Sequence, residues 1–153
     1  MSRLYGQTPV VHLPSPPKEL GRITFSEFYS ILYQLHIGGH LGVMDEEYKL
    51  TSVEEYERLL KWYQSNHPYT KYWNCDTFAW MMRAKMLEWC NGEFPCGWIW
   101  ASSTDKNYPF GPHGFNWVLD YQKKLYICDD LEVAAPKDKC WEFYPVKNVD
   151  MLV

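Results

Sequence analysis

The spacing of apolar residues changes part-way along the chain, and this change constrains the fold more than any other feature. Up to residue 89, apolar residues recur three or four positions apart, as they do on one face of a helix. From residue 96 onward, short aromatic and β-branched runs are bounded by Pro, Gly, Asp or Lys, which is typical of strands. Helices followed by antiparallel strands predict an α+β fold.

Capping residues mark the first two predicted helices. Thr24 or Ser26 can cap the first, and Ser52 with Glu55 three positions later has the spacing of a capping box. The third helix is expected to begin near Asn74 or Cys75 and to end before Asn91-Gly92. The predicted helices end at about Gln34, Gln64 and Trp89, and the predicted strands are 96–102, 114–120, 125–131 and 140–146.

Four prolines separate the first 22 residues from the rest of the chain. Pro9, Pro14, Pro16 and Pro17 are too many for a helix or a central strand, so residues 1–22 are interpreted as an extended arm. Such an arm packs across the domain or contacts a neighbouring protein. Residues 23–153 are long enough for one hydrophobic core and are interpreted as a single domain.

Charge and cysteine content exclude several classes of protein. The net charge is −4, with 15 basic and 19 acidic residues and no basic cluster, so nucleic-acid binding is not expected. No window approaches the roughly 18 apolar residues of a membrane helix, and the N-terminus does not read as a signal peptide. The five cysteines are an odd number without CxxC spacing, which indicates reduced thiols and a cytoplasmic protein.

Cys75 is the candidate nucleophile because of its predicted place in the first turn of a helix. Unpaired N–H groups and the helix dipole favour a thiolate there and lower the pKa of the thiol. A base must come from elsewhere in the fold. His113, at the entry to a predicted strand beside Gly111, Pro112 and Gly114, is the best placed of the five histidines.

A hairpin centred on Tyr121 would bring an acidic residue to His113. With that register Asp129 lies opposite His113 and on the same face of the sheet, where it could orient the imidazole. A shift of register or a bulge would instead favour Asp130, or would bring Asn116 near the site.

Three segments resemble those of the transglutaminase-like and papain-like cysteine peptidase superfamily, and most closely its bacterial and phage transglutaminase-like branch. They are Asn74-Cys75-Asp76-Thr77-Phe78-Ala79, His113-Gly114-Phe115-Asn116 and Leu125-Tyr126-Ile127-Cys128-Asp129. The layout is also similar to that of the fungal agglutinin protease domain. The resemblance covers about residues 45–135, with Thr77 in place of a frequent second acidic residue and Asp130-Leu131 in place of a frequent Pro-Gln.

The resemblance implies a papain/transglutaminase-like core in which the nucleophile helix packs on an antiparallel sheet. It further implies a triad of Cys75, His113 and Asp129. The resulting hypothesis is a cofactor-independent acyl-transfer enzyme (a peptidase, amidase or deamidase) acting on peptides or carboxamides. Residues next to the triad are the expected substrate-binding set: Trp73, Asn74, Asn116 and Trp117.

Two alternative functions remain open at this stage. The chain could keep the fold without activity, as an interaction or structural protein such as a viral particle or phage-encoded component. It could also be a cell-wall amidase of the NlpC/P60 type, although the second polar partner expected soon after His113 is missing.

Two further sequence features suggest binding sites. His36 and His40 have the spacing of a metal pair, but Gly38-Gly39 between them argues against the helix that such a pair needs, so no metal site is predicted. Eight tryptophans could line a sugar or peptide groove, with Trp98 and Trp100 on one face of a strand; half-buried core aromatics are the simpler interpretation.

Overall fold

The computed structural model describes residues 11–34, 45–66, 75–103, 110–128, 144–145 and 149–151. The helices of this part are α1 (Phe25–Gln34), α2 (Val53–Asn66) and α3 (Cys75–Trp89). A two-stranded antiparallel sheet pairs β1 (Gly21–Thr24) with β2 (Glu47–Leu50). A five-stranded antiparallel sheet has the order β6 (Tyr144–Pro145), β5 (Leu125–Cys128), β4 (Phe110–Leu119), β3 (Cys96–Ser103) and β7 (Val149–Met151).

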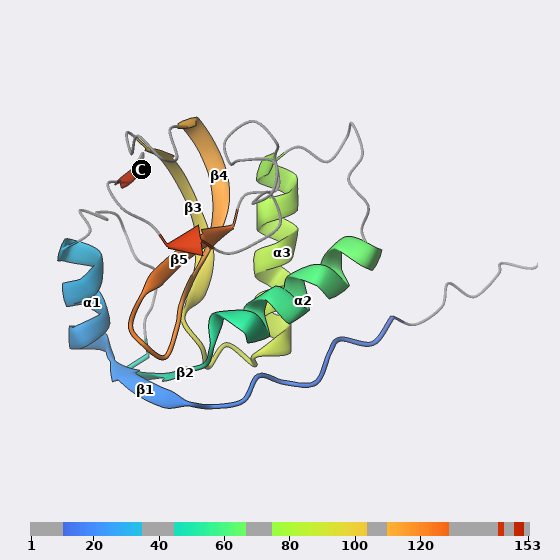
Figure 1. Ribbon diagram of the computed structural model, residues 1–153, viewed down its shortest axis with the longest axis horizontal. Helices are drawn as coiled ribbons and strands as arrows, with labels where there is room; N and C mark the ends of the chain where they lie inside the picture. The colour runs from blue at the N-terminus through green and yellow to red at the C-terminus, as the bar shows by residue number, and fades with distance from the viewer. Residues whose placement is uncertain are drawn as a thin grey trace, which may run out of the picture.

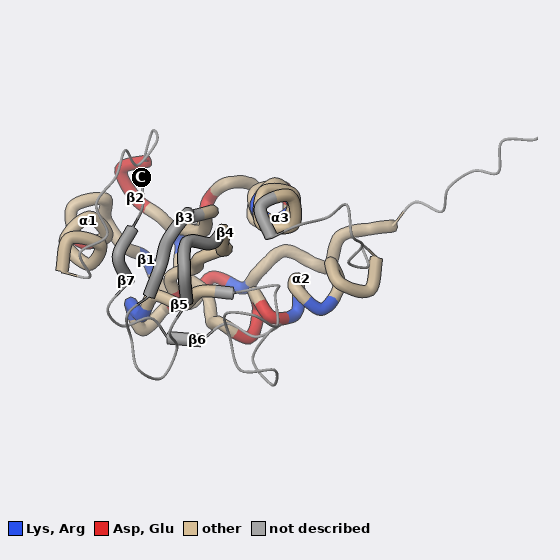
Figure 2. Tube along the Cα trace, turned by 90° about the horizontal axis from the view of Figure 1, so that it is seen from above, with Lys and Arg blue, Asp and Glu red and all other residues tan. Residues whose placement is uncertain are grey.

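The predicted α+β class is confirmed, and the larger sheet separates two groups of helices. Figures 1 and 2 show α1 on one side of β3, β4 and β5, with α2 and α3 on the other side. Successive side chains of β4 point to opposite faces of the sheet, and both faces are buried. Val118 packs into the cluster formed with α2 and α3, whereas Leu119 packs into the cluster formed with α1, β1 and β2. These elements do not by themselves identify a papain/transglutaminase-like core.

Helix α1 begins where the sequence predicts, and its cap is reciprocal. The Thr24 backbone N–H donates to Glu27 Oε2 at 3.1 Å, and the Glu27 N–H donates to Thr24 Oγ1 at 3.3 Å. Lys123, in the turn between β4 and β5, donates to Glu27 Oε1 at 2.9 Å. The bond from Lys123, followed by the bonds from Thr24, lowers the pKa of Glu27 to about 2. This carboxylate therefore joins the helix to the distant hairpin.

Helix α2 also begins where predicted, but the acidic partner of its cap is different. The Glu55 carboxylate binds Arg58 at 2.5 Å. It is Glu54 whose side chain hydrogen-bonds Ser52, and that bond lowers the pKa of Glu54. The capping-box spacing therefore located the helix start correctly and assigned the wrong glutamate, because Glu55 has a cation one turn away.

The segment before β1 lies against the helices. Ser15 O accepts hydrogen bonds from Trp89 Nε1 at 2.7 Å and from Arg58 Nη2 at 2.8 Å, and Pro17 is buried. Strand β1 starts at Gly21, inside the segment that the sequence assigns to the arm. Strands β1, β2 and β7 were not predicted, since each has four residues or fewer and lacks a clear alternation.

The hairpin of β4 and β5 is centred on Gln122, whereas the sequence predicted Tyr121. Asn116 is the Cα partner of Cys128, Leu119 is the partner of Leu125, and the Asp120 N–H donates to Lys124 O at 3.0 Å. The predicted register is therefore wrong by two residues along the strands. Asp120 explains the difference, because its Oδ1 accepts from the N–H groups of Gln122 and Lys124, both at 2.9 Å, and fixes a turn centred one residue later than predicted.

Candidate functional site

The structure places the backbone of two predicted catalytic residues. Cys75 is the first residue of α3, as predicted, and His113 lies in β4 with Ala101 of β3 as its Cα partner. Helix α3 packs against both strands. The side chains of Cys75 and His113, and the whole of Asp129 and Asp130, lie outside the described residues. The catalytic roles of Cys75, His113 and Asp129, and any thiol-hydrolase activity, therefore stay predictions.

Two of the predicted substrate-binding residues make structural contacts instead of lining an open surface. Asn116 is buried, and its Nδ2 donates to Ala79 O of α3 at 2.8 Å and to Gly97 O of β3 at 3.3 Å. Trp117 lies 5.7 Å from Phe28 of α1 between ring centroids, within the second core cluster. Trp73 and Asn74 lie outside the described residues.

Within the described residues, no three His, Cys, Asp or Glu side chains are grouped so that they could hold a metal ion. His36 and His40 fall outside those residues. The described helices also include none that is both long enough and apolar enough to cross a membrane.

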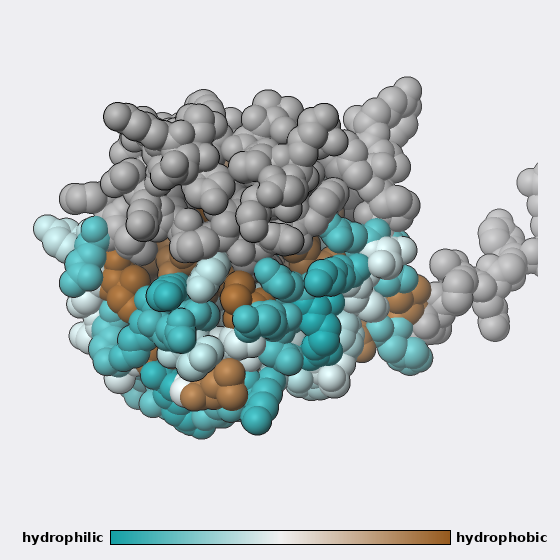
Figure 3. Space-filling view, viewed as in Figure 1, coloured by the Kyte–Doolittle hydropathy of each residue, from teal (hydrophilic) through white to brown (hydrophobic). Residues whose placement is uncertain are grey.

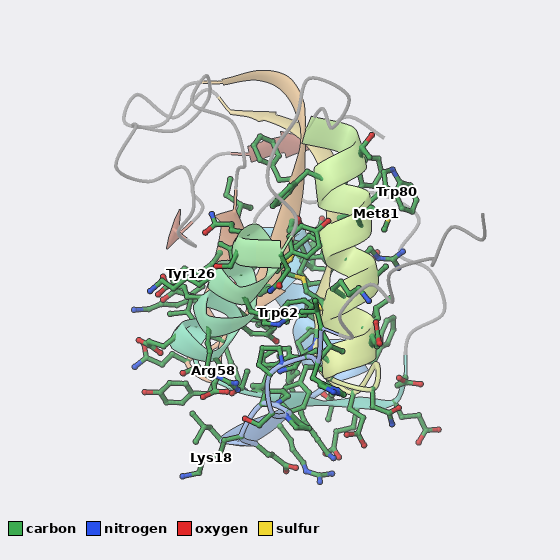
Figure 4. All side chains as sticks on the ribbon, turned by 90° about the vertical axis from the view of Figure 1, so that its right-hand side faces the viewer. Lys18, Arg58, Trp62, Trp80, Met81 and Tyr126 are labelled. Carbon is green, nitrogen blue, oxygen red and sulfur yellow. The ribbon has the colours of Figure 1, made fainter. Side chains whose placement is uncertain are left out.

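An exposed tryptophan on α3 is the most distinctive surface feature of the described residues. The Trp80 side chain is 50% exposed, and its ring stacks on that of Trp98 of β3 with centroids 4.7 Å apart and an interplanar angle of 27°. Figure 4 shows Trp80 and Met81 on the side of α3 that faces away from α2, whereas Trp62 lies between the two helices. Met81 is 40% exposed and extends the apolar surface beside the indole.

The helix and the sheet together fix the place of this indole pair. Phe78, Ala79, Met82 and Met86 occupy the buried face of α3, which turns Trp80 and Met81 outward. Trp98 is the Cα partner of Asn116 across β3 and β4, and its ring stacks on one face of the Trp80 ring. An aromatic side chain held in this way loses little conformational entropy when a ligand binds to it.

Polar side chains flank the exposed indole along the same helix face. Thr77 lies three residues before Trp80 and Arg83 lies three residues after it, and both are partly exposed. A hydroxyl and a guanidinium group can donate hydrogen bonds to a ligand resting on the ring. We define the indole surface as Trp80, Met81 and Trp98 together with these two polar neighbours.

Helix α1 carries a second exposed aromatic group, formed by Phe25, Tyr29 and Tyr33, in which the Phe25 and Tyr29 ring centroids lie 6.0 Å apart. Figure 3 shows mainly hydrophilic residues over the described part of that face, with hydrophobic residues in small groups between them. Charges of both signs lie close together along α2 (Figure 2), where Glu55 and Arg58 form an ion pair.

The sequence analysis missed Trp80 and identified Trp98. Trp80 and Met81 both stand at positions of α3 outside its apolar stripe, and large apolar residues at such positions are the signal that would have found the surface. For Trp98 and Trp100 the sequence analysis preferred half-buried core aromatics to a groove, and Trp98 is indeed half-buried; the side chain of Trp100 lies outside the described residues.

Comparison with known proteins gives one informative likeness. No protein-family model matches the chain, and no curated protein matches it. The solved structure of Polyporus squamosus lectin bound to the human-type influenza-binding epitope Neu5Aca2-6Galb1-4GlcNAc is similar, with a TM-score of 0.55 and 15% sequence identity. The match covers 82% of this chain and 48% of the lectin, so the chain spans about half the length of that protein.

These comparisons contradict the transglutaminase-like and papain-like assignment made from the sequence motifs. The matching structure is that of a lectin, and no peptidase family model supports the assignment. The acyl-transfer function was inferred from that resemblance and is contradicted as well. The motifs were short, and a Cys near a helix start followed by a His in a strand also arises in proteins without that chemistry.

Proposed function

We propose that this chain is a glycan-binding module and that the indole surface on α3 and β3 contacts the sugar. The observation that carries the proposal is Trp80, half exposed and held in place by its stack on Trp98. The likeness to a lectin supports it at the level of the fold, because an identity of 15% does not extend to site residues.

The chemistry of the surface suits a pyranose ring. One face of such a ring presents C–H groups, which pack on the electron-rich face of an indole, while the hydroxyl groups at its edge require hydrogen-bond partners. Trp80 supplies the flat apolar platform, and Met81 widens it. Thr77 and Arg83, one turn away in either direction, supply polar groups at the rim.

The affinity of one such platform is expected to be modest. Truncating an exposed aromatic anchor costs roughly 1–3 kcal/mol of binding free energy, which corresponds to about 5- to 150-fold in the dissociation constant. Binding of a single sugar at this surface is therefore expected near the millimolar range, and multivalent presentation strengthens it by avidity.

A glycan array probed with the whole chain tests the proposal. The array includes Neu5Aca2-6Galb1-4GlcNAc, which the matching lectin binds, and the same glycan without its terminal acidic sugar. Hits are then titrated against the wild type, Trp80→Ala and Tyr33→Ala. Tyr33 is the matched control, because it is an exposed aromatic residue (74%) on α1, at the other side of the sheet.

The expected result is specific binding that Trp80→Ala weakens by at least about 5-fold and Tyr33→Ala leaves unchanged. Absence of binding to every glycan at millimolar concentration would overturn the proposed function. If both variants keep the wild-type affinity, the chain binds glycans at a site other than the indole surface.

A further inference from the structure

Two thiols that the indole surface does not use lie against each other at the end of α3. Cys90 follows the last residue of α3 and Cys96 opens β3. Both are buried, at 3% and 9% exposure, and both belong to the core cluster shared with α2. Their side chains are hydrogen-bonded to each other, and neither is in a disulfide.

A tight turn brings the pair together. Gly92 N–H donates to Leu87 O at 3.0 Å, and Glu93 N–H donates to Cys90 O at 3.0 Å, so the chain reverses directly after the helix. Asn91 and Gly92 take left-handed backbone angles, with φ of 51° and 70°. A glycine or asparagine is needed for this geometry, and the sequence provides both.

The turn also surrounds one of the two sulfur atoms with donors. The Phe94 N–H points to the Cys90 sulfur, the Gly92 N–H is shared between this sulfur and Leu87 O, and the Cys96 thiol donates to the sulfur. Successive N–H groups of a turn form a concave site for an anion. The bond from Cys96, together with these N–H groups, lowers the pKa of Cys90 to about 7, whereas the bond to Cys90, followed by burial, raises the pKa of Cys96 well above its usual range.

We propose that Cys90 and Cys96 form a reversible disulfide site that reacts with small hydroperoxides, Cys90 being the attacking thiol and Cys96 the resolving thiol. The Cys90 thiolate attacks one oxygen of hydrogen peroxide, the O–O bond breaks, and Cys90 becomes a sulfenic acid while hydroxide leaves and takes a proton to form water. The Cys96 thiol then attacks the Cys90 sulfur, the S–O bond breaks, and a second water leaves with the thiol proton. Two thiols and one peroxide give one disulfide and two waters.

The position of the pair explains the choice of oxidant. Both residues are buried, so access to their sulfur atoms is narrow, and hydrogen peroxide can reach them more easily than a bulky disulfide such as oxidised glutathione. An added dithiol reverses the bond by thiol–disulfide exchange. The remaining cysteines of the chain (Cys75, Cys128 and Cys140) serve as internal comparisons, since trypsin places each of them in a peptide of its own.

Peptide mapping of the folded chain after peroxide treatment tests the proposal. Trypsin releases residues 86–106 as one peptide containing both thiols, and a Glu-specific protease then cuts after Glu93, between them. An intramolecular disulfide leaves the tryptic peptide two hydrogen atoms lighter and keeps its halves linked after the second cut. The expected result is this linked pair at low peroxide, and its disappearance after dithiothreitol.

The order of the two steps is tested with single variants trapped by dimedone, which reacts with sulfenic acids. In Cys96→Ser the adduct is expected on Cys90. In Cys90→Ser the yield on Cys96 is expected to be lower by about 10-fold, because burial still disfavours the Cys96 thiolate. Circular dichroism confirms that both variants are folded. Equal trapping at the two positions would overturn the assigned order.

Two results would overturn the site itself. One is a tryptic peptide 86–106 that stays reduced at peroxide doses that oxidise the other three cysteines. The other is linkage that forms only in urea at concentrations that unfold the chain, since the hydrogen-bonded pair exists only in the folded state.

Discussion

Gly97→Ala is expected to destabilise the fold because the Trp117 ring lies directly over Gly97. The two residues are Cα partners across β3 and β4. A Cβ at position 97 would lie 2.4, 2.5 and 2.7 Å from three side-chain atoms of Trp117. Ordinary contact begins at 3.4 Å, so the indole must move by about 1 Å.

The loss of stability depends on the residues that pack behind the Trp117 ring. Trp117 contacts Phe28, a fully buried residue of α1, so the ring moves only if the helix or the strand shifts. Overpacking of this kind costs about 1–3 kcal/mol, and we expect the upper half of that range. In a chain of 153 residues, 2–3 kcal/mol lowers Tm by roughly 5–10 °C.

Thermal and urea unfolding followed by circular dichroism measure this effect, with Gly21→Ala as the control. A Cβ at Gly21 of β1 meets nothing within 4 Å, so that variant is expected within about 0.5 kcal/mol of the wild type. In a Trp117→Leu background the cost of Gly97→Ala should nearly vanish. Equal effects of Gly97→Ala in both backgrounds would refute the reasoning.

Two further predictions concern single side chains. Asn116→Ala removes the amide donor of the Ala79 and Gly97 carbonyl groups and should lower the free energy of unfolding in urea by about 2–3 kcal/mol. An unchanged urea midpoint would show that water replaces the amide. Glu27→Gln should lower Tm at pH 7 and not at pH 2. A carboxyl group with a depressed pKa stabilises the fold at pH values above its unfolded pKa of about 4.5, and this stabilisation is lost as the pH falls toward 2. A difference in Tm that does not depend on pH would exclude the ion pair with Lys123 as the source of the stabilisation.

Local signals predicted the helices well. Thr24 and Ser52 located two helix starts, and Asn91-Gly92 located the end of α3, because capping and left-handed turns depend on nearby residues alone. The acidic partner of Ser52 was wrong because it depends on where Arg58 points, which the sequence spacing left open.

Long-range features were harder to predict. The hairpin register was off by two residues because the Asp120 carboxylate binds two N–H groups of its own turn, a choice that alternation does not encode. Asn116 and Trp117 looked like site residues, since a polar and a large aromatic residue beside His113 suit substrate binding. Their buried contacts with Ala79 and Phe28 come from the packing of α3 and α1 on the sheet.

The indole surface was only half visible from the sequence. The alternation of Trp98 with Trp100 predicted that the two share one face of a strand. The stack of Trp98 on Trp80 joins β3 to α3, and this contact was not predicted. Periodicity assigns Trp80 to the outer face of the helix and gives no indication that another indole supports it.

The indole N–H signals of an NMR titration test the central claim most directly. The chain, labelled with ¹⁵N, is titrated with the strongest glycan from the array, and Trp80→Phe and Trp98→Phe assign the two signals. The account predicts saturable shifts at Trp80 and Trp98, with Trp62 and Trp89 unmoved because they pack within the core between α2 and α3. Shifts confined to other tryptophans, or none at saturating glycan, would contradict it.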